Sequence, residues 1–91
     1  MNTPNSFRGA DPQAVQAYFE GNGWTASPGK QNVDYPVVKL EPNNEGLKGH
    51  QIRIMPGGAT RPVPIKQGPH MIINGGSIRD LIIPLKGTPT L

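Results

Sequence analysis

Residues 50–85, HQIRIMPGGATRPVPIKQGPHMIINGGSIRDLIIPL, decide the fold that we predict for this 91-residue chain. Short runs rich in β-branched residues alternate there with glycine and proline, a pattern typical of strands joined by tight turns. Within residues 50–55 apolar and polar side chains alternate, so we expect Ile52 and Ile54 to face the core. Arg53 is then expected to lie on the opposite face, in the middle of a strand.

A hairpin is predicted at the end of the same stretch. Gly75-Gly76 is a typical two-residue hairpin turn, and it separates expected strands at residues 70–74 and 77–85. Residues 61–66 contain two prolines, which suit only an edge strand or an irregular bridge between strands.

The first part of the chain predicts one helix. Residues 1–10 have the composition of a flexible lead-in. Asp11 is a typical helix N-cap, and Pro12 fits the first helical position because its missing N–H has no partner there. The expected helix is short, so its apolar residues Val15 and Phe19 must pack on something, with a sheet face as the natural partner.

Two further strands are expected at residues 24–27 and 35–41, joined to residues 50–55 by a polar turn region. The predicted fold is α+β: a short N-terminal helix packed on a four- to five-stranded, mostly antiparallel sheet. Residues 11–91 form a single small domain, because a chain this short builds one thin core.

Composition excludes several classes of protein. The chain has no cysteine, so disulfides and thiolate metal sites are ruled out. Two histidines twenty residues apart, with no nearby carboxylate, make a poor zinc site, and no phosphate-binding loop motif is present. We therefore expect no metal and no cofactor. No apolar run approaches the ~20 residues that span a membrane.

Charge is unevenly distributed along the chain. Residues 1–45 carry three Lys/Arg against five Asp/Glu, a net −2, whereas residues 46–91 carry six against one, a net +5. This polarity is typical of proteins that bind an anionic partner, with nucleic acid as the first candidate. Scattered solvated charges on a soluble sheet explain it equally well.

The side chains that remain suit RNA cleavage by transesterification. In that reaction the substrate's own 2′-OH attacks the adjacent phosphate, so the protein supplies only an acid, a base and cations. We expect His70, at the start of a strand and facing a cleft, to be the acid or base. Arg53 and Arg79 would bind the phosphate, and Ser77 and Arg79 could lie across the hairpin from His70.

Each of these assignments has a simpler alternative. His70 could be a strand histidine that hydrogen-bonds a turn carbonyl, Arg53 a solvated residue of the sheet, and Ser77 a turn residue. The expected substrate-binding residues outside this group are Lys48, His50, Lys66 and Lys86. Trp24, Tyr18 and Tyr35 could stack on bases, but a small domain needs its aromatic residues for packing.

Four segments carry a family resemblance: RIM (53–55), GPH (68–70), SIR (77–79) and IPLKGTPTL (83–91). Together they resemble the C-terminal toxin domains of bacterial polymorphic and contact-dependent growth inhibition systems, within the RNase group that shares the barnase–EndoU–colicin–RelE-like fold. The resemblance covers roughly residues 50–91. It implies catalytic roles for Arg53, His70, Ser77 and Arg79. The chain departs from larger relatives in having one recognisable helix.

The resemblance also implies a setting. The substrate would be RNA, and tRNA is one option. The partner would be a cognate acidic immunity protein, and the free domain would be a monomer. The domain would be exported as part of a larger protein and act in the cytoplasm of a target cell.

The competing interpretation is a non-enzymatic basic β-rich module that binds nucleic acid or a protein. Residues 46–91 contain no Phe, Trp or Tyr, which favours phosphate handling over base stacking.

Overall fold

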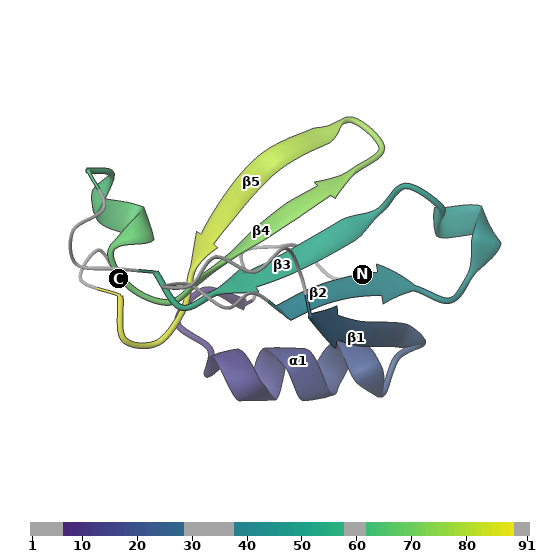
Figure 1. Ribbon diagram of the computed structural model, residues 1–91, viewed down its shortest axis with the longest axis horizontal. Coiled ribbons are helices and arrows are strands. Elements are labelled where there is room, and N and C mark those ends of the chain that lie inside the picture. The colour runs from purple at the N-terminus through teal and green to yellow at the C-terminus, as the bar shows by residue number, and fades with distance from the viewer. Residues whose placement is uncertain (1–6, 29–37, 58–61, 89–91) are drawn as a thin grey trace.

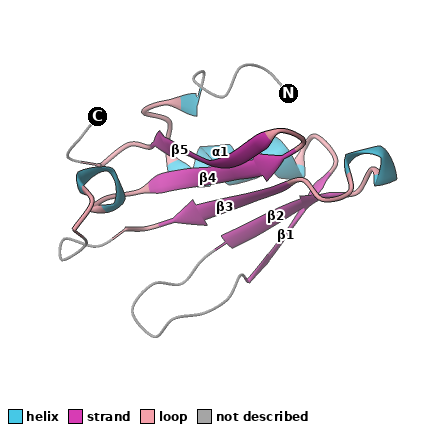
Figure 2. Cartoon of the chain, turned by 90° about the horizontal axis from the view of Figure 1, so that it is seen from above, coloured by secondary structure: helices cyan, strands magenta, loops and turns pink. Residues whose placement is uncertain are grey.

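The computed structural model of the chain describes residues 7–28, 38–57 and 62–88. It shows a five-stranded antiparallel sheet in which the strands follow one another in sequence order, with one helix, α1, packed on one face (Figures 1 and 2). The predicted α+β class is confirmed. The elements are α1 (Pro12–Glu20), β1 (Trp24–Pro28), β2 (Val38–Pro42), β3 (Gln51–Met55), β4 (His70–Gly75) and β5 (Ile78–Pro84), with 3-10 turns η2 (Glu45–Leu47) and η3 (Pro64–Lys66).

Helix α1 begins where the sequence predicts. The Asp11 side chain accepts a hydrogen bond from the backbone N–H of Gln13 at 3.0 Å, and Pro12 occupies the first turn. Val15 and Phe19 are buried against the sheet, as expected from their spacing. Tyr18, on the same helix, is 41% exposed and packs edge-on against the rings of Phe7 and Phe19.

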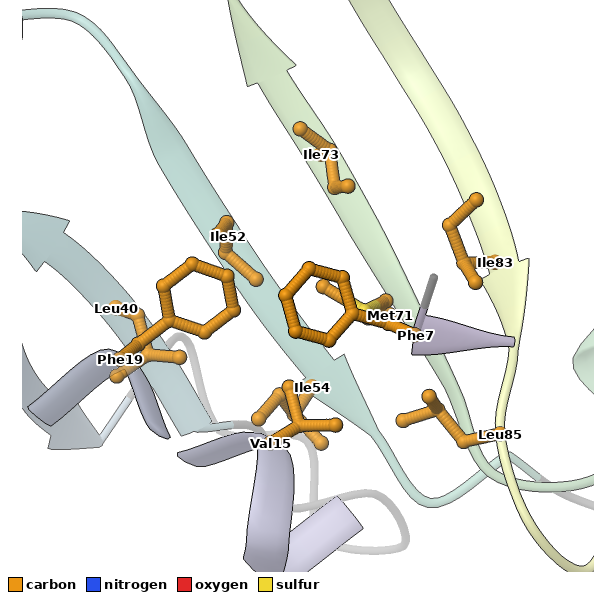
Figure 3. Packing of buried hydrophobic residues seen from close by; sticks show 10 residues of the cluster. All are labelled: Phe7, Val15, Phe19, Leu40, Ile52, Ile54, Met71, Ile73, Ile83 and Leu85. Carbon is orange, nitrogen blue, oxygen red and sulfur yellow. The ribbon is translucent and has the colours of Figure 1, made fainter. Parts of the chain in front are cut away.

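The core lies between α1 and the sheet (Figure 3). Alternate residues of the central strands point into it, so β3 contributes Ile52 and Ile54 and β4 contributes Met71 and Ile73. This alternation is what buries one face of a sheet and leaves the other for polar side chains. The buried apolar cluster consists of Phe7, Val15, Phe19, Leu40, Ile52, Ile54, Met71, Ile73, Ile83 and Leu85.

The ordered domain starts earlier than predicted. Phe7, assigned above to a flexible lead-in, is buried and its ring stacks near those of Tyr18 and Phe19. The backbone N–H of Gly9 donates to the carbonyl of Pro84 at 2.9 Å. The predicted lead-in of residues 1–10 is therefore too long, because one aromatic residue in a polar stretch was enough to join the core. Residues 1–6 lie outside the described residues.

Strands β4 and β5 form the predicted hairpin, but its turn lies one residue later than expected. Gly75 pairs with Ile78, so Gly76 and Ser77 are the turn residues. Beyond the turn the register shifts between Ile73 and Gly75, which marks a β-bulge. With the later turn and the bulge, the residue opposite His70 is Pro84.

The proline-rich stretch before β4 is an irregular bridge. Residues 62–66 contain the single 3-10 turn η3 and no strand, so the edge-strand alternative is wrong for this part. Close contacts at two glycines fix the position of the bridge. A Cβ on Gly57 would overlap the carbonyl of Gly68, and a Cβ on Gly68 would overlap the backbone of Thr88. Three backbone segments thus touch where no side chain fits. Arg61, and residues 35–37 of the strand predicted at 35–41, lie outside the described residues.

Candidate functional site: the open face of the sheet

The sheet face opposite α1 carries most of the polar side chains of the strands. We call the side chains of Lys39, Glu41, Gln51, Arg53 and Asn74 the open face, because each is half-buried or exposed and alternates with a core residue. The register places Lys39 directly beside Arg53, and Gln51 directly beside Asn74. Lys39 also forms an ion pair with Glu41 along the same strand, at 3.4 Å.

Arg53 lies at the centre of this face, as predicted. Its strand is flanked on both sides, by Lys39 of β2 and Ile72 of β4. The side chain is 38% exposed, and a terminal nitrogen lies 3.6 Å from a carboxylate oxygen of Asp80. The Nε atom is shielded from solvent and has no hydrogen-bond partner within the described part of the chain. The guanidinium is therefore held on one side and open to solvent on the other.

Asp80 is a site residue that the sequence analysis missed. It lies in the β5 bulge with a φ of +47°, a conformation that Asp adopts more readily than most residues. Its backbone N–H donates to the side-chain oxygen of Asn74 at 2.9 Å, and the Asn74 amide donates back to its carboxylate at 3.2 Å. These two hydrogen bonds fix the carboxylate beside Arg53, although its side chain remains 74% exposed. The sequence did offer one signal for this position: an Asp, which tolerates a positive φ, lies close to the predicted hairpin turn.

His70 does not face a cleft. Its side chain is 0% exposed, so the placement predicted above is wrong. Its Nδ1 lies 2.8 Å from the carbonyl oxygen of Gly68, and because a carbonyl can only accept, Nδ1 is the protonated nitrogen of this bond. This is the contact expected from the simpler alternative, a strand histidine that satisfies a turn carbonyl.

The structure separates His70 from the residues predicted to lie across the hairpin. His70 pairs with Pro84, whereas Gly75, at the far end of the same strand, pairs with Ile78. The strand from His70 to Gly75 covers roughly 17 Å, so Ser77, in the turn, lies at least that far along the hairpin from His70. Arg79 lies beside the last residues of the same strand, also far from His70. Both are exposed, and Ser77 is part of the turn, as its simpler alternative stated.

The four predicted substrate-binding residues divide between the two ends of the sheet. Lys48 and His50 lie before β3, at the end where β4 finishes, and they line one pocket of about 410 Å³. Lys66 is in η3 and Lys86 follows β5, so both lie at the end where β4 begins. The structure therefore brings Lys48 and His50 together but does not join them to Lys66 or Lys86.

The aromatic residues have mainly a packing role. Phe7, Tyr18, Phe19 and Trp24 form a chain of ring contacts with centroids 5.2–5.5 Å apart on the α1 side of the sheet. This agrees with the expectation that a small domain uses its aromatic residues for packing. Tyr35 lies outside the described residues.

Metal ligands and membrane-spanning helices are missing from the described ranges. No three His, Asp or Glu side chains in residues 7–28, 38–57 and 62–88 gather closely enough to hold a metal ion. No helix in those ranges has the length and apolar character needed to cross a membrane. Comparison with known proteins found no matching family model, curated protein or solved structure.

Proposed function

We propose that this chain is a metal-independent ribonuclease that cleaves RNA by transesterification on the open face of its sheet. The observation that carries the proposal is the pairing of Arg53 with Asp80, a cation and a carboxylate held side by side on the accessible face of the sheet. A base and a phosphate-binding cation are the two groups that the attack of a 2′-OH needs first.

The proposed reaction assigns one role to each residue. The Asp80 carboxylate accepts the proton of the 2′-OH while the 2′ oxygen forms a bond to phosphorus. Arg53 donates to the phosphate oxygens, whose charge increases as the phosphorane forms, and its planar fork fits two of them. The bond from phosphorus to the 5′ oxygen then breaks, and water supplies the proton that this oxygen needs. The products are a 2′,3′-cyclic phosphate and a 5′-hydroxyl.

Three of the four predicted catalytic residues receive different roles in this proposal. Because His70 is fully buried, it supports the fold and does not touch RNA. Arg79 is exposed and adjacent to Asp80, so it adds positive charge at the same end of the sheet. Ser77 stays a turn residue.

The biological setting is also part of the proposal, and its support is the resemblance described for residues 50–91. The ribonuclease would act as a toxin domain, delivered as part of a larger exported protein into the cytoplasm of a target cell. A cognate immunity protein would neutralise it. An acidic surface on that partner would complement the net +5 charge of residues 46–91.

The test uses an oligonucleotide with one ribonucleotide in a DNA strand, and a matched all-DNA strand. We expect the first to be cleaved to a 2′,3′-cyclic phosphate in the presence of EDTA, and the second to remain intact. Arg53→Ala and Asp80→Asn should each lower the rate by roughly 10²–10⁴-fold, the usual contribution of one positioned catalytic group. Arg53→Lys should restore part of the rate, because an ammonium carries the charge without the fork.

Arg8→Ala is the matched control, since it removes the same charge from an exposed position outside the open face. Equal losses in Arg8→Ala and Arg53→Ala would mean that only net charge matters, and the proposed site would be wrong. RNA that is bound but never cleaved would support the non-enzymatic binding module instead.

A further inference from the structure

A second pocket lies on the other side of the sheet from Arg53. It has a volume of about 410 Å³, and its lining residues come from the C-terminal end of α1, the start of β1, the turn η2 and the residue before β3. Its walls are mostly aromatic or apolar, with two polar side chains among them. The lining residues are Tyr18, Phe19, Asn22, Trp24, Leu47 and His50.

Apolar side chains of this pocket are partly exposed, although a small domain usually buries such side chains in its core. Tyr18 is 41% exposed and Leu47 is 38% exposed, although both are large apolar side chains. The rings of Tyr18 and Trp24 each lie against Phe19, at 5.3 and 5.2 Å between centroids, so their orientations are fixed from behind. Rigid, partly exposed rings of this kind stack on planar groups at a small entropic cost.

Two polar groups at the pocket are held in place by the backbone. The Asn22 amide nitrogen donates to the carbonyl of Tyr18 at 2.6 Å, which leaves the side-chain oxygen as a hydrogen-bond acceptor. The His50 ring lies directly on the Cα of Gly75, where any Cβ would overlap it. The ring therefore packs on the Gly75 backbone, and His50 is the second of these polar side chains in the lining of the pocket.

We propose that this pocket binds one unstacked nucleobase of an RNA substrate. A base has a flat apolar face that suits Tyr18 and Trp24, and edge groups that suit Asn22 and His50. The inference rests on the proposed function for the identity of the ligand as RNA. It deepens that function, because a base held at the same end of the sheet as Asp80 would help to select where the strand is cut.

The neighbouring pocket, which Lys48 lines, limits how much a phosphate group can add to the binding affinity. It shares His50 with the aromatic pocket and contains Lys48, but Glu41 and Glu45 line it as well. Two carboxylates beside one ammonium give no net attraction for an anion. Affinity at this end of the molecule should therefore come from the base itself.

The test measures base binding separately from cleavage. The chain has one tryptophan, so the indole N–H of Trp24 gives a single NMR cross-peak that reports on this pocket. We expect it to shift on titration with at least one of the four nucleoside 5′-monophosphates, and not with ribose 5-phosphate. Tyr18→Ala and Leu47→Ala alter exposed positions and should weaken the binding by roughly 5- to 100-fold.

Two variants serve as controls. Gln13→Ala changes an exposed residue at the other end of α1, and Arg53→Ala changes the opposite face, so both should leave the titration unchanged. No shift with any nucleotide, or an equal shift with ribose 5-phosphate, would overturn the pocket inference even if RNA is cleaved. A nucleotide-dependent shift without cleavage would uphold the pocket while the ribonuclease proposal fails.

Discussion

Replacement of His70 by Ala separates a structural role from a catalytic one. The side chain is fully buried and donates to the Gly68 carbonyl, so its removal leaves a cavity and an unsatisfied acceptor. Large-to-small changes at buried sites cost about 2–5 kcal/mol, and one hydrogen bond contributes about 1 kcal/mol within such totals. We expect a loss of about 3 kcal/mol in the free energy of unfolding, out of the ~5–14 kcal/mol typical of a chain this size.

Urea unfolding gives the measurement. With a slope of roughly 1 kcal/mol per molar urea for a small domain, the midpoint should fall by roughly 3 M. Circular dichroism and Trp24 fluorescence should give the same midpoint if the transition is two-state. Arg79→Ala, at an exposed position of the same hairpin, is the control and should stay within about 0.5 kcal/mol of the wild type.

The opposite outcome would refute this reasoning. A His70→Ala protein with an unchanged midpoint would show that the ring carries little packing energy. If its RNA cleavage also fell by roughly 100-fold, a catalytic role for His70 would be supported, since that is the usual contribution of one acid or base.

Three further predictions concern the fold and the open face. Gly57→Ala should destabilise the protein by at least about 2 kcal/mol in urea unfolding, because the new Cβ would overlap Gly68 and the φ of +76° disfavours Ala. Gly49→Ala, at a φ of +92° with open space around it, should cost only about 1–2 kcal/mol for the left-handed backbone. Equal costs for the two variants would contradict the close packing of Gly57 on Gly68. Asp80→Asn should change the free energy of unfolding by less than about 1 kcal/mol, because its ion pair with Arg53 is largely exposed and Asn also adopts a positive φ. A larger loss would show that the pair supports the fold. RNA affinity should fall by about 0.7 decade per decade of salt for each phosphate contacted, as read by fluorescence anisotropy, and a flat salt profile would exclude phosphate contacts.

Local signals were sufficient to predict most of the elements. The helix was predictable because its cap, its first-turn proline and its buried residues all lie within ten positions. The face on which Arg53 lies was predictable because alternation in β3 is strict and both neighbouring residues are buried isoleucines. Both inferences depend only on neighbours in sequence.

The errors concern features set by distant parts of the chain. His70 follows the irregular bridge before β4. The position of that bridge depends on contacts among Gly57, Gly68 and Thr88, and no local sequence pattern encodes this packing. The position of Asp80 depends on a bulge, and a bulge appears only when the register of two strands is known. Ser77 and Arg79 were misplaced for a different reason. A hairpin turn next to residue 75 puts them opposite the far end of β4, whereas His70 begins that strand and pairs with Pro84.

The order of the strands has a consequence for how the chain folds. Each strand pairs with the next along the sequence, so the sheet can grow by adding one hairpin at a time, with short loop closures throughout. The exceptions join the two ends: Gly9 bonds to Pro84, and Lys86 bonds back to Ala10. These contacts join residues far apart in the sequence, so their loop-closure entropy cost is the largest. We expect them to form last, after the sheet has assembled. They also hold residues 9 and 10 next to residues 84 and 86. A circularly permuted chain that links residue 88 to residue 7 and opens in the Gly76-Ser77 turn would keep every strand pair.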